Sequence, residues 1–138
     1  MPREIAAEIP LAQGIFYQIL NKRPDIFRSP GLTQGQVIQD MLASLGMCNI
    51  FTDTDPNDWT MPRISSQEII NNIEMQLHPG QVILLHDGGS HTQTVNATQG
   101  IIDVIYKHGY MIVTMKQMMQ AAAGTVFTNQ RVERYEAL

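Results

Sequence analysis

The chain has 138 residues, of which 43% are hydrophobic and 16% are charged, and its formal net charge is −4. This composition is typical of a folded globular protein and excludes an intrinsically disordered chain. A single cysteine excludes an internal disulfide framework. The Lys and Arg residues are scattered rather than clustered, so we expect no nucleic-acid partner and no anionic membrane partner.

The N-terminal sequence lacks the apolar segment of a secretory signal, and no apolar run reaches the about 18 residues that a membrane span needs. We therefore expect no signal peptide in this chain, and its localisation stays open. Cys48 lies within an apolar run, which predicts a small buried hydrophobic residue.

In chain order, the pattern predicts an opening helix over residues 3–21, which Pro10 should kink or split. Short apolar runs then alternate with amphipathic stretches. The runs, predicted to be buried strands, cover residues 25–28, 47–52, 81–86 and 110–114. Capping-box spacing predicts helix starts at three pairs: Thr33 with Gln36, Ser65 with Glu68, and Thr114 with Gln117.

A further helix is predicted over residues 94–107, with an inward face formed by Val95, Ile101, Ile102 and Ile105. Strands that alternate with helices imply an α/β fold with parallel strands. About four strand–helix units make a partial (β/α) barrel, half of a closed eight-stranded one. We expect one domain over residues 1–124 and a polar C-terminal tail over residues 125–138.

Three of the predicted strands end in polar clusters, over residues 28–31, 53–59 and 86–89. Because catalytic residues of parallel α/β folds lie beyond the carboxyl ends of strands, these clusters are the candidate site. His86 follows an apolar strand and opens a glycine-rich turn, which suits either a general acid or base or a structural histidine. The neighbouring Asp87 could orient its imidazole.

The other polar residues carry alternatives. The aspartates before Trp59 could bind a metal or an arginine, although turn capping by Asp side chains is the commoner role. Trp59 could stack on a sugar, although core packing is commoner. His86 and His91 lack a third ligand at zinc-like spacing, so no metal site is predicted. The same turn lacks the lysine of a phosphate-binding P-loop.

In this order and spacing, the clusters resemble the last three motifs of the polysaccharide deacetylase family of carbohydrate esterases. Residues 27–30 (Phe-Arg-Ser-Pro) resemble its Arg-x-Pro-Tyr segment, residues 55–59 fit Asp-x-x-Asp-Trp, and residues 83–89 fit the Leu-x-His-Asp segment. The likeness covers roughly residues 3–120 and implies a distorted (β/α) barrel. It also implies removal of N- or O-acetyl groups from chitin-like glycans, peptidoglycan or xylan with a divalent, zinc-like metal.

The resemblance also implies residue roles. Arg28, paired with a carboxylate such as Asp58, would tune the catalytic base, and His86 would be the general acid. Trp59 and Leu84 would wall the acetyl pocket. Further site residues are Pro30, Gly31 and, in a supporting role, Asp55 and Asp87. Gly31 stands where the family has tyrosine, and its backbone amide could still face an oxyanion.

The family's first two motifs, Thr-Phe-Asp-Asp and His-(Ser/Thr)-x-x-His, have no counterpart in this sequence. They would supply the base and the metal ligands. We therefore expect the chain to match the C-terminal two-thirds of a deacetylase domain, to be inactive alone, and to need either a missing N-terminal segment or a homodimer partner at its open sheet edge. The family is usually extracellular or in the cell envelope.

Two other hypotheses stay open at this stage. The first is a non-catalytic remnant of the fold that binds a glycan or a protein partner. The second is a small flavodoxin-like domain in which Asp53 or Asp87, at a strand end, would accept a phosphoryl group.

Overall fold

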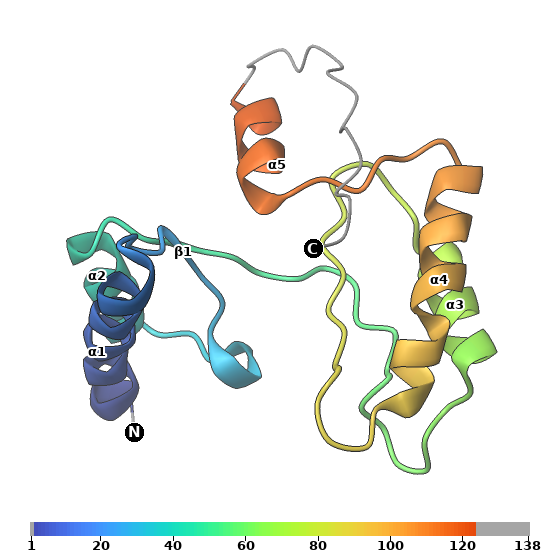
Figure 1. Cartoon of the computed structure of the whole chain (residues 1–138), viewed down its shortest axis with the longest axis horizontal. Coiled ribbons are helices and arrows are strands. Elements are labelled where there is room, and N and C mark those ends of the chain that lie inside the picture. The colour runs from blue at the N-terminus through green and yellow to red at the C-terminus, as the bar shows by residue number, and fades with distance from the viewer. Residues whose placement is uncertain (1, 124–138) are drawn as a thin grey trace. The chain divides into compact units, whose positions relative to one another are not determined.

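A computed structural model describes residues 2–123, and the predicted polar tail lies outside the described residues (Figure 1). The chain divides into two compact units, Met1–Asp53 and Thr54–Leu138. Each unit has its own hydrophobic cluster. Among the described residues, no helix has both the length and the apolar character needed to cross a bilayer.

The first unit contains α1 (Pro2–Leu20), β1 (Ile26–Phe27), a 3-10 turn (Pro30–Leu32), α2 (Gln36–Ser44) and β2 (Cys48–Asn49). The two strands pair in parallel, with Ile26 opposite Cys48. Helix α1 packs against α2 through a core formed by Ile9, Ile38, Leu42 and Met47. The order β1–α2–β2 is the strand–helix–strand unit that the sequence predicts.

The second unit contains α3 (Ser66–Glu74), α4 (Thr92–Lys107) and α5 (Met115–Ala122). Helices α3 and α4 lie side by side (Figure 1). Their contact buries Ile69, Ile73, Ala97, Ile101 and Ile105. An isolated parallel bridge joins Thr54 to Ile83, so the predicted strand at residues 81–86 is an extended segment with a single bridge.

Several local predictions are wrong. Residues 110–114 form no strand, and the two strands of the first unit are shorter than predicted. Helix α2 begins after Gly35 without a side-chain cap, because the Thr33 hydroxyl donates to the Pro30 carbonyl instead. Pro10 lies inside one continuous helix, so it does not split α1.

Two predicted core residues are exposed. Cys48 is exposed because Met47, its neighbour in the chain, is the residue that turns into the core. On α4, Val95 is 56% exposed, whereas Ala97 and Val104 are buried. The predicted inward residues Ile101 and Ile105 are buried, so the inward face is confirmed there, whereas Val95 was wrongly included.

Helix α3 begins with the capping box that its sequence predicts. Ser65 Oγ accepts a hydrogen bond from the Glu68 amide, and the Glu68 carboxylate accepts one from the Ser65 amide. The Thr114 and Gln117 pair caps α5 in the same way. Both predictions are confirmed, and the two helix starts are fixed locally by sequence.

Replacing Ser65 with Ala should lower the free energy of unfolding of the second unit by about 1 kcal/mol, because one amide of the first turn loses its acceptor. Urea unfolding followed by far-UV circular dichroism measures the change. Ser65→Gly is the matched variant, since glycine tolerates the cap conformation and costs only a few tenths of a kcal/mol. Equal losses in the two variants would contradict the capping role.

Candidate active site

The loop that carries Asp58 is held by its own side chains. Asp55 Oδ1 accepts from the Asn57 amide at 2.9 Å, and Oδ2 accepts from Trp59 Nε1 at 2.8 Å. Asn57 has a φ of 64°, in the left-handed region that Asn tolerates. The turn-capping interpretation of Asp55 is therefore confirmed, and Asp55 also fixes the Trp59 ring.

Asp58 and His86 meet although 28 residues separate them in sequence. Asp58 Oδ1 lies 2.8 Å from His86 Nδ1, and Oδ2 accepts from the His86 amide at 2.7 Å. The Thr94 hydroxyl donates to Oδ2 at 2.9 Å. We call Asp58 and His86 the dyad. Together with Thr94, the dyad connects the loop after residue 54, the extended segment before residue 86 and the first turn of α4.

Asp58 is only 2% exposed, and its side chain is fully buried. Burial by itself disfavours its charged form, but the hydrogen bonds from the His86 amide, the His86 ring and Thr94 outweigh this cost and lower the pKa of Asp58 below its usual value. Asp58 is therefore a carboxylate at neutral pH, and a carboxylate only accepts hydrogen bonds. His86 Nδ1 must carry the proton of the 2.8 Å contact.

This arrangement leaves His86 Nε2 as the reactive atom. The His86 side chain is 37% exposed, and within residues 2–123 no hydrogen bond occupies Nε2. The prediction that the neighbouring Asp87 orients the ring is wrong, because the carboxylate that contacts the ring belongs to Asp58. An imidazole with one nitrogen anchored and the other open is suited to proton transfer.

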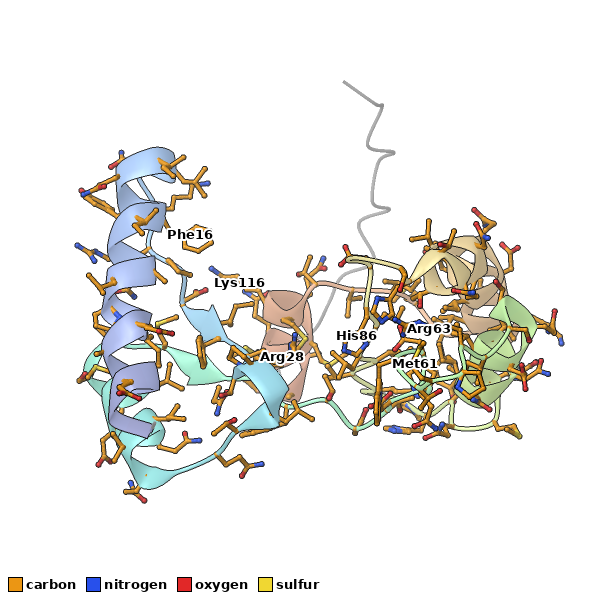
Figure 2. The ribbon with its side chains drawn as sticks, turned by 90° about the horizontal axis from the view of Figure 1, so that it is seen from below. Phe16, Arg28, Met61, Arg63, His86 and Lys116 are labelled. Atoms are coloured by element: carbon orange, nitrogen blue, oxygen red, sulfur yellow. The ribbon has the colours of Figure 1, made fainter. Side chains whose placement is uncertain are left out.

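A second histidine packs on the first. The rings of His86 and His91 stack with centroids 5.4 Å apart and an interplanar angle of 24°. Figure 2 shows the side chain of Arg63 near that of His86. Arg63 Nη1 lies 2.9 Å from His91 Nε2. The sequence did not single out Arg63 or Thr94.

The two predicted wall residues differ in exposure. Trp59 is 52% exposed, so it is not a core residue of this unit. Its ring lies at the surface, where Nε1 donates a hydrogen bond to Asp55. Leu84 is buried at 8% exposure. Its amide donates to the Thr54 carbonyl at 2.9 Å, which fixes the extended segment two residues before His86.

Arg28, Pro30 and Gly31 belong to the first unit. Arg28 directly follows β1, and Pro30 and Gly31 form the start of the 3-10 turn. Gly31 has a φ of 60°, which a glycine adopts without strain and a tyrosine does not. The predicted pairing of Arg28 with Asp58 joins the two units and stays a prediction.

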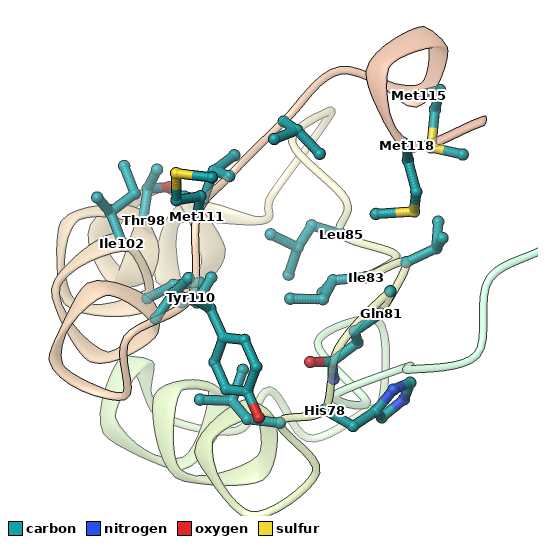
Figure 3. Close-up of a pocket in the computed structure, with 17 residues that line it drawn as sticks. His78, Gln81, Ile83, Leu85, Thr98, Ile102, Tyr110, Met111, Met115 and Met118 are labelled. Atoms are coloured by element: carbon teal, nitrogen blue, oxygen red, sulfur yellow. The ribbon is translucent and has the colours of Figure 1, made fainter. Parts of the chain in front are cut away.

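The second unit also contains an apolar cavity of about 430 Å³. Ile83 and Leu85 line it from the segment that precedes His86, and Tyr110 and Met118 line it from beyond α4 (Figure 3). The segment before His86 therefore lines the cavity with Gln81, Val82, Ile83 and Leu85, while His86 itself contacts Asp58.

A divalent metal does not fit the described residues. Among residues 2–123, no three His, Cys, Asp or Glu side chains group closely enough to hold one. Both oxygens of Asp58 already accept hydrogen bonds, and His91 Nε2 is taken by Arg63. These residues can transfer a proton, but they cannot supply a metal-bound nucleophile.

Most of the chain is similar in sequence to known carbohydrate deacetylases. It is 31% identical over 108 residues to a peptidoglycan-N-acetylglucosamine deacetylase of Bacillus cereus, an alignment that covers 76% of this chain and 50% of the relative. A chitooligosaccharide deacetylase of Azorhizobium caulinodans is 29% identical over 98 residues, covering 62% of this chain and 46% of the relative. The resemblance to the polysaccharide deacetylases is confirmed. No protein-family model matches the chain.

The fold of this chain also matches solved structures of carbohydrate deacetylases and related proteins. The peptidoglycan deacetylase of Bacillus subtilis superposes with a TM-score of 0.75 at 24% identity, covering 90% of this chain and 58% of that one. A family 4 carbohydrate esterase pseudoenzyme of Bacillus anthracis gives 0.74 at 18% identity, covering 86% of this chain and 41% of that one. This chain thus spans about half the length of the curated deacetylases that it matches.

Proposed function

We propose that this chain forms part of a metal-dependent carbohydrate deacetylase, in which it supplies the general acid for hydrolysis of N- or O-acetyl groups on a polysaccharide. The observation that carries the proposal is the dyad: a buried carboxylate holds His86 Nδ1 and leaves Nε2 open. The similar deacetylases named for peptidoglycan and chitooligosaccharide support an acetylated glycan as the substrate class.

In the proposed reaction, His86 acts as an imidazolium with a proton on each ring nitrogen and donates the Nε2 proton to the leaving group, which leaves a neutral ring with its proton on Nδ1. When the acetyl carbon–nitrogen bond of an N-acetyl sugar breaks, the proton neutralises the departing amine; for an O-acetyl group it goes to the alkoxide. Asp58 keeps the Nδ1 proton in place throughout, so that only Nε2 exchanges a proton with the substrate. Trp59 and Leu84 are proposed to border the acetyl group, and Pro30 and Gly31 to contribute from the first unit.

The base and the metal ligands are proposed to come from residues outside this chain. The sequence contains no adjacent aspartates and no two histidines four positions apart, and the described residues offer no metal site. Arg28 keeps its predicted role of tuning that base, whereas Asp58 is assigned to His86. An apolar cavity beside the segment that carries His86 is compatible with packing against such a further segment.

The test compares this chain with a chimera. The purified chain should release no acetate from an acetylated chitooligosaccharide, because it cannot make the nucleophile. Joined to the portion of the Bacillus cereus deacetylase that it does not match, it should release acetate in the presence of zinc. Robust turnover by the isolated chain would contradict the assignment of base and metal to other residues.

An inactive chimera would favour the other candidate, a non-catalytic remnant that binds a glycan. Trp59 supports this reading, since Asp55 holds its exposed ring ready to stack on a sugar. Saturable binding of the oligosaccharide that is lost in Trp59→Ala, with no hydrolysis in either protein, would replace the acid role by this one.

A further inference from the structure

The imidazole of His86 is restrained in two directions. Asp58 holds Nδ1 in the plane of the ring at 2.8 Å, and the ring of His91 stacks against its face. A hydrogen bond alone lets a ring swing about the bonded atom, whereas a stacked neighbour limits that swing. The direction of His86 Nε2 therefore depends on where His91 lies.

The contacts of His91 define its protonation pattern. Nδ1 faces the Gly88 carbonyl, which only accepts, so Nδ1 carries a proton. Nε2 lies 2.9 Å from Arg63 Nη1, which only donates, so Nε2 is an acceptor. His91 is thus a neutral ring with its proton on Nδ1, and both of its nitrogens are used to hold it in position.

Arg63 joins the two loops that contact His86. Its Nη1 also donates to the Asp58 carbonyl at 3.2 Å, and its Nη2 donates to Ser90 Oγ at 3.1 Å. One planar guanidinium therefore links the loop of Asp58 to the loop of His91. Lysine cannot form the same set of hydrogen bonds, because its ammonium is a compact charge that lacks the planar, fixed arrangement of donors of the guanidinium.

We propose that Arg63 and His91 are positioning residues for His86: the guanidinium fixes His91, and the stacked ring of His91 sets the direction of His86 Nε2. The catalytic consequence rests on the proposed function, whereas the positioning itself is a property of the chain alone. Neither residue touches the substrate in this proposal; both act through His86.

Long-range ¹H–¹⁵N correlation spectra of the ¹⁵N-histidine-labelled chain at pH 8 test the positioning directly. In the unmodified chain, His86 and His91 should each show a single neutral form with the proton on Nδ1. Arg63→Lys should shift and broaden the ring signals of His91, and His91→Ala should do the same to those of His86, while Asp58 still keeps the His86 proton on Nδ1. His91→Phe should change the His86 signals less than His91→Ala does, because it keeps a ring but offers Arg63 no acceptor. Unchanged His86 signals in His91→Ala, with Asp58 present, would overturn the proposal.

Arg23→Lys is the matched control for the arginine, since Arg23 contacts Tyr17 in the first unit, and it should change neither histidine. Far-UV circular dichroism tests the folding of every variant. If Arg63→Lys does not fold, the comparison of His91→Ala with His91→Phe still decides whether the stacked ring positions His86.

In the active chimera, His91→Ala should lower kcat by about ten- to a hundredfold with KM unchanged. An inactive chimera would count against the proposed function, whereas the spectra alone judge the positioning.

Discussion

Replacing His86 with Ala in the zinc-loaded chimera should lower kcat by about 10²- to 10⁴-fold, the usual contribution of a general acid. The leaving amine would then depart without a proton, because among the described side chains only His86 has a ring nitrogen held by Asp58 and a second nitrogen left open to the substrate. KM should change little, since the ring contributes mainly after the substrate is bound. Acetate release under saturating oligosaccharide measures the effect.

His78→Ala is the matched control for this experiment. His78 is an exposed histidine of the same unit, and its Nδ1 contacts the neighbouring Pro79 carbonyl in a turn. Its removal should leave the rate within twofold or so, as expected for a residue outside the reacting groups. A His86→Ala chimera that keeps the full rate would remove the acid role from the dyad.

The second large effect is expected at Asp58. Asp58→Asn should lower the free energy of unfolding of the second unit by about 1–3 kcal/mol, because an amide cannot accept at both of its ends and one buried donor loses its partner. The donors at risk are the His86 amide, the His86 ring and the Thr94 hydroxyl. Thr94→Val is the partial counterpart and should cost less, since it removes one of these three bonds. Urea unfolding at pH 7 measures both variants, and an Asp58→Asn protein of undiminished stability would contradict the role of the carboxylate.

The same carboxylate predicts a pH dependence. Its folded-state pKa is lowered, so its contribution to stability is complete above the unfolded-state pKa of about 3.9 and is lost as the pH falls through the lower folded-state value. Stability of the unmodified chain should therefore fall below about pH 4, and Asp58→Asn should flatten that fall.

The flattening should be incomplete. The pKa values of Glu68 and Glu74 are also lowered, the first by hydrogen bonds from Ser65 and the second mainly by the hydrogen bond from His108. Glu74→Gln is therefore the control, because it removes a different acid-sensitive group from the same unit. An identical pH profile for Asp58→Asn and the unmodified chain would show that Asp58 is not the group that titrates.

The parts of the fold that the sequence predicted well depend on neighbours within about one helical turn. The capping boxes of α3 and α5 were predicted correctly because the hydroxyl and its partner lie three residues apart. The strands were predicted too long because pairing needs a partner from elsewhere in the chain. Residues 110–114 are apolar but find no strand partner among the described residues.

The candidate site shows the same limit. His86 and Asp58 could be named from the motifs, but their contact could not, since 28 residues separate them and the adjacent Asp87 was the expected partner of the ring. Arg63 was missed altogether, because its role depends on three acceptors supplied by two loops. Distant contacts of this kind follow from chain folding and leave no local signal.

Trp59 is the single tryptophan of the sequence, and its indole is half exposed and tethered to Asp55. Intrinsic fluorescence excited at the indole band therefore reports on the surroundings of Trp59 in the second unit, from a position beside the dyad. Far-ultraviolet ellipticity includes α1 and α2 and so reports on the first unit as well. Comparing the two optical transitions in one titration would reveal whether the two units melt together or one after the other.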